Sequence, residues 1–104
     1  MENNSFEPYY AVIFTSKLKE GNQESYRKMA QRMEELAEKQ EGYLGIESAK
    51  EGIGITVSYW KDLTSIQQWK QNSDHIQAQE LGKRSWYEAY TIRIAKVEKE
   101  YKFD

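Results

Sequence analysis

Two hydrophobic periods alternate along this chain, and their order constrains the fold more than any other feature of the sequence. Segments with apolar residues at every second position predict strands at 9–17, 43–49, 53–60 and 86–103. Segments with apolar residues three or four apart predict helices at 24–40 and 63–81. This order predicts one ferredoxin-like α+β domain over residues 9–103, with an antiparallel sheet and both helices on one face.

Residues with special backbone preferences mark the expected boundaries. Pro8 stops a helix from entering the first strand, so residues 1–8 are expected to form a flexible N-terminal arm. Asp62 is an expected N-cap, because its side chain accepts a bond from a free N–H group of the first helical turn. Gly42 suits a left-handed helix end, and Gly52 predicts a hairpin turn between the second and third strands.

Two irregularities are predicted within the elements. Asn72 and Ser73 weaken the helical pattern of the second helix, which predicts an interruption and a new helix start just before residue 75. In the last strand the apolar positions change phase near Ala95 and Lys96, which predicts a bulge or bend there.

Charge and composition exclude several classes of protein. The chain of 104 residues has 15 basic and 17 acidic side chains spread along it, so no basic stripe indicates binding to nucleic acid or an anionic membrane. No apolar run approaches the roughly 20 residues of a membrane span. The absence of cysteine excludes disulfides, thiolate nucleophiles and cysteine-bound metals. Without a signal-peptide pattern at its start, the protein is expected to be cytoplasmic.

The first strand is apolar on both faces. Tyr10, Val12 and Phe14 share one face, while Ala11 and Ile13 lie on the other. Since the helices can cover only one face, the second face would be a large exposed apolar patch in a monomer. The sequence therefore predicts a homodimer packed sheet to sheet across a two-fold axis. Alternation alone leaves open which face meets the helices.

The first helix carries an apolar stripe that includes two methionines. Its members are Tyr26, Met29, Ala30, Met33, Leu36 and Ala37. A stripe of this kind can line a ligand pocket, but we interpret it as core packing against the sheet.

Several motifs resemble a known family. They are Gly42-Tyr-Leu-Gly after the first helix, Ser58-Tyr-Trp60 closing the third strand, Asp62-Leu-Thr-Ser-Ile-Gln-Gln-Trp69 in the second helix, and Trp86-Tyr87 before the last strand. Together they resemble the antibiotic biosynthesis monooxygenase domain family of dimeric α+β barrel proteins. The resemblance covers Tyr9 to Phe103 and implies a pocket between helices and sheet in each subunit. That superfamily holds quinone-forming oxygenases, haem-degrading enzymes and proteins of unknown role, so activity has to be argued from the site.

Aromatic and hydroxyl side chains supply the candidate substrate contacts. Trp69 and Ile66 on the second helix are expected to form a slot for a flat small aromatic or hydrophobic ligand. Strand and loop residues expected to complete the slot are Tyr10, Phe14, Thr56 or Ser58, Trp60, Tyr87 and Tyr90. The alternative interpretation is that Trp60 and Trp69 are large core residues.

His75 is the only histidine, and its unperturbed pKa near neutrality suits a general base toward a phenol, or a haem or metal ligand. The alternative is a surface or capping histidine. The resemblance to haem-degrading relatives implies an Asn on the first strand, a Trp on the second helix and a His near the far end of that helix. Only Trp69 fits, and Glu80 stands at the position of the ligand histidine.

The resemblance implies a cofactor-independent monooxygenase of a phenolic or quinol-like aromatic, with Trp69 and His75 as catalytic residues. The sequence contains no glycine-rich phosphate loop and no cluster of metal ligands, so we expect neither cofactor nor metal. The same pattern fits two other classes of protein. One is a non-catalytic binding protein for haem or a small hydrophobic ligand, or a haem-degrading-like enzyme, and the other is a structural dimer without a ligand.

Overall fold

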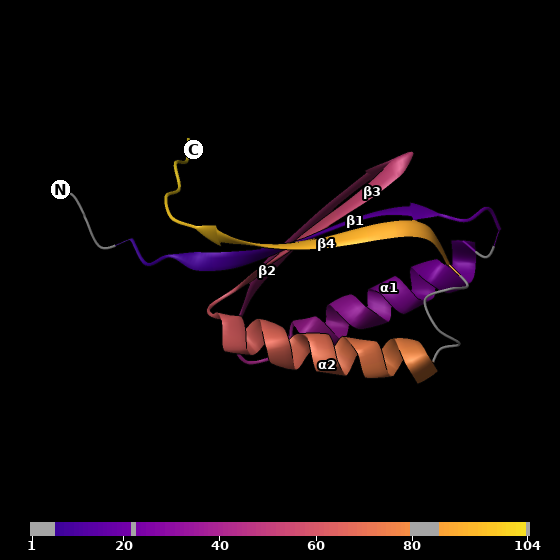
Figure 1. Cartoon of the computed structure of the whole chain (residues 1–104), viewed down its shortest axis with the longest axis horizontal. Coiled ribbons are helices and arrows are strands. Elements are labelled where there is room, and N and C mark those ends of the chain that lie inside the picture. Colours follow the sequence, from indigo (N-terminus) through magenta and orange to yellow (C-terminus); the bar gives the residue numbers. More distant parts are fainter. Residues whose placement is uncertain (1–5, 22, 80–85, 104) are drawn as a thin grey trace.

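The computed structural model describes residues 6–21, 23–79 and 86–103, without the side chains of 23 and 75–79. Its elements are β1 (Tyr9–Leu18), α1 (Gln23–Ala37), β2 (Tyr43–Glu51), β3 (Ile53–Trp60), α2 (Leu63–Gln79) and β4 (Tyr87–Val97). The strands form one antiparallel sheet in the order β2-β3-β1-β4, and both helices lie on one face of it (Figure 1). The predicted ferredoxin-like arrangement is confirmed. No helix in the described ranges is long and apolar enough to cross a membrane.

The second helix is continuous, so the predicted interruption at Asn72 and Ser73 is wrong. The Ser73 hydroxyl donates to the Lys70 carbonyl at 3.1 Å, one turn back in the same helix. The Asn72 amide donates to the side-chain oxygen of Gln40 at 3.0 Å, beyond the end of α1. Both side chains therefore bond in ways that are compatible with a helix, instead of competing with its backbone bonds.

The last strand is shorter than predicted and has its irregularity elsewhere. Val97 pairs with Tyr9, the first residue of β1. Residues beyond Val97 therefore have no partner residue in β1 and lie outside the sheet. The register runs unbroken past Ala95 and Lys96, and the shift occurs between Lys17 and Leu18 instead. The predicted bulge near Ala95 is therefore wrong. The change in the apolar alternation near Ala95 and Lys96 comes just before β4 ends at Val97.

The connection into α2 is fixed by a cap and a glycine. The Ser65 N–H donates to the Asp62 carboxylate at 2.8 Å, which confirms Asp62 as an N-cap and lowers the pKa of its carboxyl group. Gly42 has φ of 87°, and a Cβ atom there would collide with the Ser65 hydroxyl. Its carbonyl accepts a bond from the Lys61 N–H at 2.7 Å. Position 42 therefore needs glycine for both its backbone angle and its lack of a side chain.

The core lies at the end of the sheet where α1 ends and α2 begins. Trp60 is fully buried there among Ala37 and Ile66. Its ring meets Tyr43 edge-on at 5.7 Å and stacks on Trp69 at 6.0 Å between centroids. Aromatic pairs in these arrangements add stability beyond their buried area.

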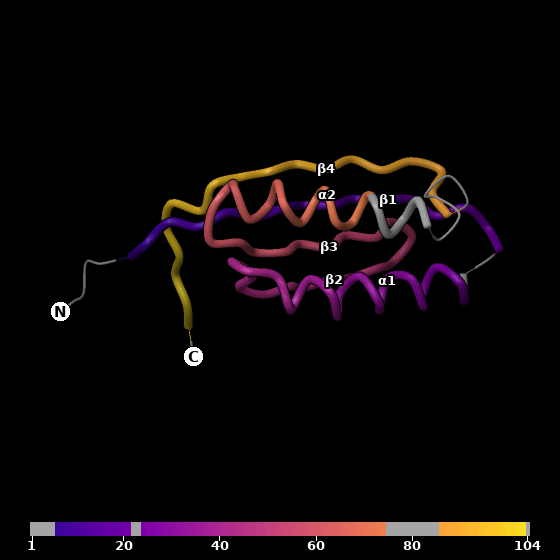
Figure 2. Tube along the Cα trace, turned by 90° about the horizontal axis from the view of Figure 1, so that it is seen from below, coloured from indigo at the N-terminus to yellow at the C-terminus, as the bar shows by residue number. Residues whose placement is uncertain are grey.

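The structure settles which face of the sheet meets the helices. Val12, Phe14 and Thr56 point toward them, since these residues line the space between sheet and helices. Ile13 and Ile55, one position away in each strand, therefore point to the opposite face. No described helix covers that face (Figures 1 and 2).

Candidate ligand-binding cavity

A cavity of about 630 Å³ separates the two helices from the sheet. Strand residues form its floor, among them Val12, Ile92 and Ile94, and the helices form two walls. Ile92 and Ile94 are 45% and 52% exposed because the space above them is open. The lining is mostly apolar, with a few hydroxyl groups, which is the usual character of a small-molecule site.

The apolar stripe of α1 forms one wall. Met29, Ala30 and Met33 line the cavity, and Met29 is buried. Our interpretation of this stripe as core packing is therefore incomplete, because only its end at Ala37 belongs to the core cluster. Methionine side chains adapt their shape readily, so this wall can adjust to a ligand.

Trp69 forms a platform on the opposite wall. One side of the half-buried indole stacks on Trp60 at 6.0 Å with 23° between the ring planes, and the ring also lines the cavity. Trp60 itself is fully buried, with no surface in the cavity. Trp60 is therefore a core residue, as in the alternative interpretation, whereas the Trp69 ring both stacks on the core and lines the cavity.

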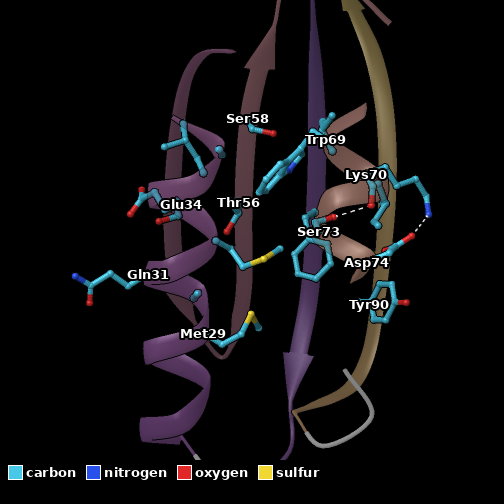
Figure 3. Close-up of a pocket in the computed structure, with 18 of the residues that line it drawn as sticks. Met29, Gln31, Glu34, Thr56, Ser58, Trp69, Lys70, Ser73, Asp74 and Tyr90 are labelled. Carbon is cyan, nitrogen blue, oxygen red and sulfur yellow. Dashed lines mark hydrogen bonds and ion pairs between the residues drawn. The ribbon is translucent and has the colours of Figure 1, made fainter. Parts of the chain in front are cut away.

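Ser58 offers a hydroxyl group beside this platform. Its oxygen accepts a hydrogen bond from Trp60 Nε1 at 2.8 Å, and its side chain lies on the cavity floor (Figure 3). No described protein group accepts the Ser58 proton. Ser58 therefore can donate to an oxygen atom of a ligand that lies against Trp69.

Phenol side chains gather toward the other end of the cavity. Tyr87 meets Phe14 edge-on at 5.4 Å, Tyr26 at 5.7 Å and Tyr90 at 5.3 Å between ring centroids. Burial raises the pKa of Tyr87 far above its ordinary value, and its hydrogen bond to Tyr26 adds to this effect. Tyr87 is therefore a weaker acid than an ordinary tyrosine, and its hydroxyl group is engaged with Tyr26.

Charged residues surround the mouth of the cavity. Lys70 and Asp74, one turn apart on α2, form an ion pair at 2.8 Å (Figure 3). This hydrogen bond raises the pKa of Lys70. Arg27 and Glu34 contribute one charge of each sign from α1. The mouth is polar but nearly balanced in charge, so it favours a neutral or weakly charged ligand.

The predicted site residues fall into three groups. The cavity brings together Phe14, Thr56, Ser58, Ile66, Trp69, Tyr87 and Tyr90. Tyr10 and Trp60 lie outside the lining, because both pack in or against the core. His75 follows Asp74 inside α2 and not at a helix start, and its side chain is outside the described part, as is Glu80.

Some lining residues were not predicted as site residues. Tyr26, Met29 and Met33 belong to the stripe already visible in the sequence, so their helical spacing was the available signal. Lys70 and Asp74 follow Ile66 and Trp69 at the same helical spacing. Within the described residues, no three histidine, cysteine, aspartate or glutamate side chains gather as ligands for a metal ion.

Comparison with known proteins gives a consistent result. Residues 9–81 match the family model described as antibiotic biosynthesis monooxygenase. The chain is 47% identical over 98 residues to the uncharacterized protein YqjZ of Bacillus subtilis, covering 92% of this chain and 85% of that protein.

Two solved structures share the fold at low sequence identity. A cofactor-independent oxygenase from Streptomyces nogalater, SnoaB, has a TM-score of 0.73 at 8% identity, with 88% of this chain and 95% of that chain covered. A conserved protein from Methanosarcina mazei has a TM-score of 0.69 at 19% identity, with 88% and 93% covered.

Proposed function

The chain belongs to the antibiotic biosynthesis monooxygenase family, and we propose that it is a cytoplasmic homodimer that oxygenates a small phenolic or quinol-like aromatic without a bound cofactor. The observation that carries the proposal is the cavity of about 630 Å³, which combines a stacking platform, a hydroxyl donor and a phenol cluster in an otherwise apolar space. These are the contacts that a flat, oxygenated aromatic molecule needs.

The chemistry of such a reaction comes largely from the substrate. A ring that has lost a proton transfers an electron to O₂, and the two radicals combine into a peroxide at a ring carbon. Loss of water from this peroxide leaves a carbonyl group, so one oxygen atom enters the product and the other leaves as water. Every electron comes from the substrate. The protein has to bind the ring, accept the proton and exclude bulk water.

Three side chains have binding roles in this proposal. Trp69 stacks on the aromatic ring, supported from behind by Trp60. Ser58 donates its free proton to a substrate oxygen, while its own oxygen accepts from Trp60. Tyr87, with its hydroxyl bonded to Tyr26, packs its ring against the opposite end of the ligand. The Ser58 donor stabilises negative charge on oxygen, which develops when the substrate loses its proton.

The proton acceptor is one of two neighbouring residues of α2. Asp74 lines the cavity but is already paired with Lys70. His75 has the unperturbed pKa better suited to accepting a proton near neutral pH. The described lining positions of α2 are 66, 69, 70, 73 and 74, and Asp74 is the last residue of this helix whose side chain the structure describes. The pH dependence of the rate distinguishes the two residues.

The dimer of this proposal uses the outer face of the sheet. Ile13, Val57 and Ile55 lie there, and Ile55 is 42% exposed. A second copy packed against this face would bury the apolar side chains of both sheets together.

Oxygen uptake tests the enzymatic proposal. Chelator-treated protein is incubated with a panel of dihydroxynaphthalenes and anthrones, and we expect substrate-dependent O₂ consumption with one O₂ used for each product formed. Trp69→Ala should abolish it, while Leu63→Ala should not, because Leu63 is exposed on the same helix and does not line the cavity.

Two other results would redirect the proposal. Saturable binding of these compounds without O₂ uptake would indicate a non-catalytic binding protein. A Soret band on haem titration that disappears in His75→Ala would indicate a haem site instead. If no member of the panel binds or reacts, the cavity has been assigned the wrong ligand class.

A further inference from the structure

The floor of the cavity contains two rows of side chains that cross the sheet through paired positions of β3, β1 and β4. The members of these rows are Ser58, Val12 and Ile94 in the first, and Thr56, Phe14 and Ile92 in the second. All of them line the cavity. Each row therefore starts with a hydroxyl group on β3 and continues with two apolar side chains, so the floor has a polar half and an apolar half.

Both β3 hydroxyl groups are available to a ligand (Figure 3). Ser58 is buried, and its oxygen accepts from Trp60 Nε1, so its proton remains available. Thr56 is half-buried, and no described residue shares a hydrogen bond with its hydroxyl group. Ser48 pairs with Thr56 from the edge strand β2, but it is exposed, so water can bond to it. The donors inside the cavity are therefore at positions 56 and 58 of the floor.

The apolar half of the floor decides how a ligand is oriented. A ligand oxygen over Val12 or Ile94 would give up its bonds to water without finding a donor on the floor, which costs free energy. A hydrocarbon ring in the same place would bury its own apolar surface and that of the floor. An oxygenated aromatic ligand is therefore expected to place its oxygens over β3 and its unsubstituted part over β1 and β4.

The spacing of the sheet sets the dimensions of such a ligand. Positions 56 and 58 are about 7 Å apart along β3, and β4 lies about 10 Å from β3, with β1 between them. In a naphthalene skeleton, oxygens at carbons 1 and 4 are separated along the short axis, and the second ring extends at right angles to the line between them. The two donors and the apolar half of the floor are arranged in the same way. Oxygens on adjacent carbons would instead both lie close to one hydroxyl group.

We infer that the ligand is a fused aromatic ring system with two oxygens in the 1,4 arrangement on one ring, and that Thr56 is the second donor that selects it. The oxygenated ring lies over β3, with one oxygen at Ser58 and the other at Thr56, and the second ring lies over β1 and β4. This inference rests on the proposed function, because the quinone product of that reaction carries both oxygens.

Binding of stable ligands tests this inference without requiring turnover. We titrate 1,4-naphthoquinone, and 1-tetralone with one oxygen on the same ring skeleton, into wild type and Thr56→Val by calorimetry. The chain contains no cysteine, so the quinone forms no thiol adduct. Thr56→Val should weaken binding of 1,4-naphthoquinone by about three- to tenfold, the usual effect of one lost hydrogen bond. Its affinity for 1-tetralone should be unchanged, because the single oxygen can bond to Ser58.

Two further titrations serve as controls. Thr91→Val makes the same side-chain change on the opposite face of the sheet, one position from Ile92, and should alter neither affinity. The isomer 1,2-naphthoquinone, whose oxygens are on adjacent carbons, should bind the wild type more weakly than 1,4-naphthoquinone and should not depend on Thr56.

The results distinguish failure of this inference from failure of the proposed function. An unchanged affinity of Thr56→Val for 1,4-naphthoquinone, or an equal loss for 1-tetralone, would show that Thr56 does not bond to a second oxygen. A 1,2 isomer that binds as tightly and depends equally on Thr56 would overturn the 1,4 arrangement. In each of these cases the cavity still binds the proposed class of ligand. If no naphthoquinone binds the wild type, the ligand class of the proposed function is wrong, and this inference fails with it.

Discussion

At the scale of single residues, Ser58 connects the core to the cavity. Its hydroxyl oxygen is the acceptor for the buried Trp60 Nε1, and its proton remains available to a ligand. Trp60 holds Trp69 by stacking, so one buried indole positions both a donor and a platform. The effects of mutation at Ser58 should therefore appear in both stability and ligand binding.

Ser58→Ala should lower the free energy of unfolding by about 1–3 kcal/mol, because the buried Trp60 N–H loses its acceptor. Urea denaturation measures this change. Thr56→Val is the matched control, since Thr56 also lies on the cavity floor but makes no comparable bond to the core. If both variants lose the same stability, the Trp60–Ser58 bond has no special role.

The rate should rise with pH through about 6.5 if His75 accepts the substrate proton, because only the neutral imidazole is a base. We expect His75→Gln to remove this step and to lower kcat by about 100-fold or more. The measurement is kcat against pH for the wild type and for His75→Gln. A profile that is unchanged in His75→Gln but altered in Asp74→Asn assigns the role to Asp74.

At the scale of elements, features that depend on local sequence were predicted better than features that depend on contacts between distant parts of the chain. Asp62 and Gly42 were identified correctly because capping depends on the residue itself and its immediate neighbours. The end of β4 was not, since it is set by the first residue of β1, far away in the sequence. Asn72 was misread because its partner, Gln40, is distant in sequence, and Ser73 was misread because its hydroxyl can either cap a new helix or bond the carbonyl one turn back, as it does here.

Gly42→Ala should destabilise the fold by about 2–5 kcal/mol, because it combines a positive φ with a collision against Ser65. Gly52→Ala has a similar φ of 82° but open space around the new methyl group, so about 1–2 kcal/mol is expected there. Thermal unfolding of the two variants compares them. Equal losses would mean that the Ser65 contact relaxes without cost.

At the scale of the whole molecule, the two faces of the sheet have different surroundings (Figure 1). One face forms the cavity floor, and we propose that the other forms the dimer interface. The sequence could not assign these faces, because β1 is apolar on both, and only the placement of the helices over Val12 and Phe14 decides. The phenol cluster was equally hidden, since Tyr26 and Tyr87 are distant in sequence and meet through the fold.

A lysine on each face of β1 should have opposite effects. Ile13→Lys places a charge in the proposed interface and should give a monomer by light scattering, because burying an unpaired charge is costly. Val12→Lys places the same charge at the cavity floor, so it should retain the dimer and lose ligand binding. Two dimeric variants would refute the sheet-to-sheet assembly.

The most direct test of the central claim is a single-turnover reaction under ¹⁸O₂, with chelator-treated protein and the best substrate from the panel. We predict a quinone with one labelled oxygen atom, labelled water as the second product, and no product from Trp69→Ala. A product that takes its oxygen from unlabelled solvent, or a reaction that proceeds equally well in Trp69→Ala, would contradict oxygenation in this cavity.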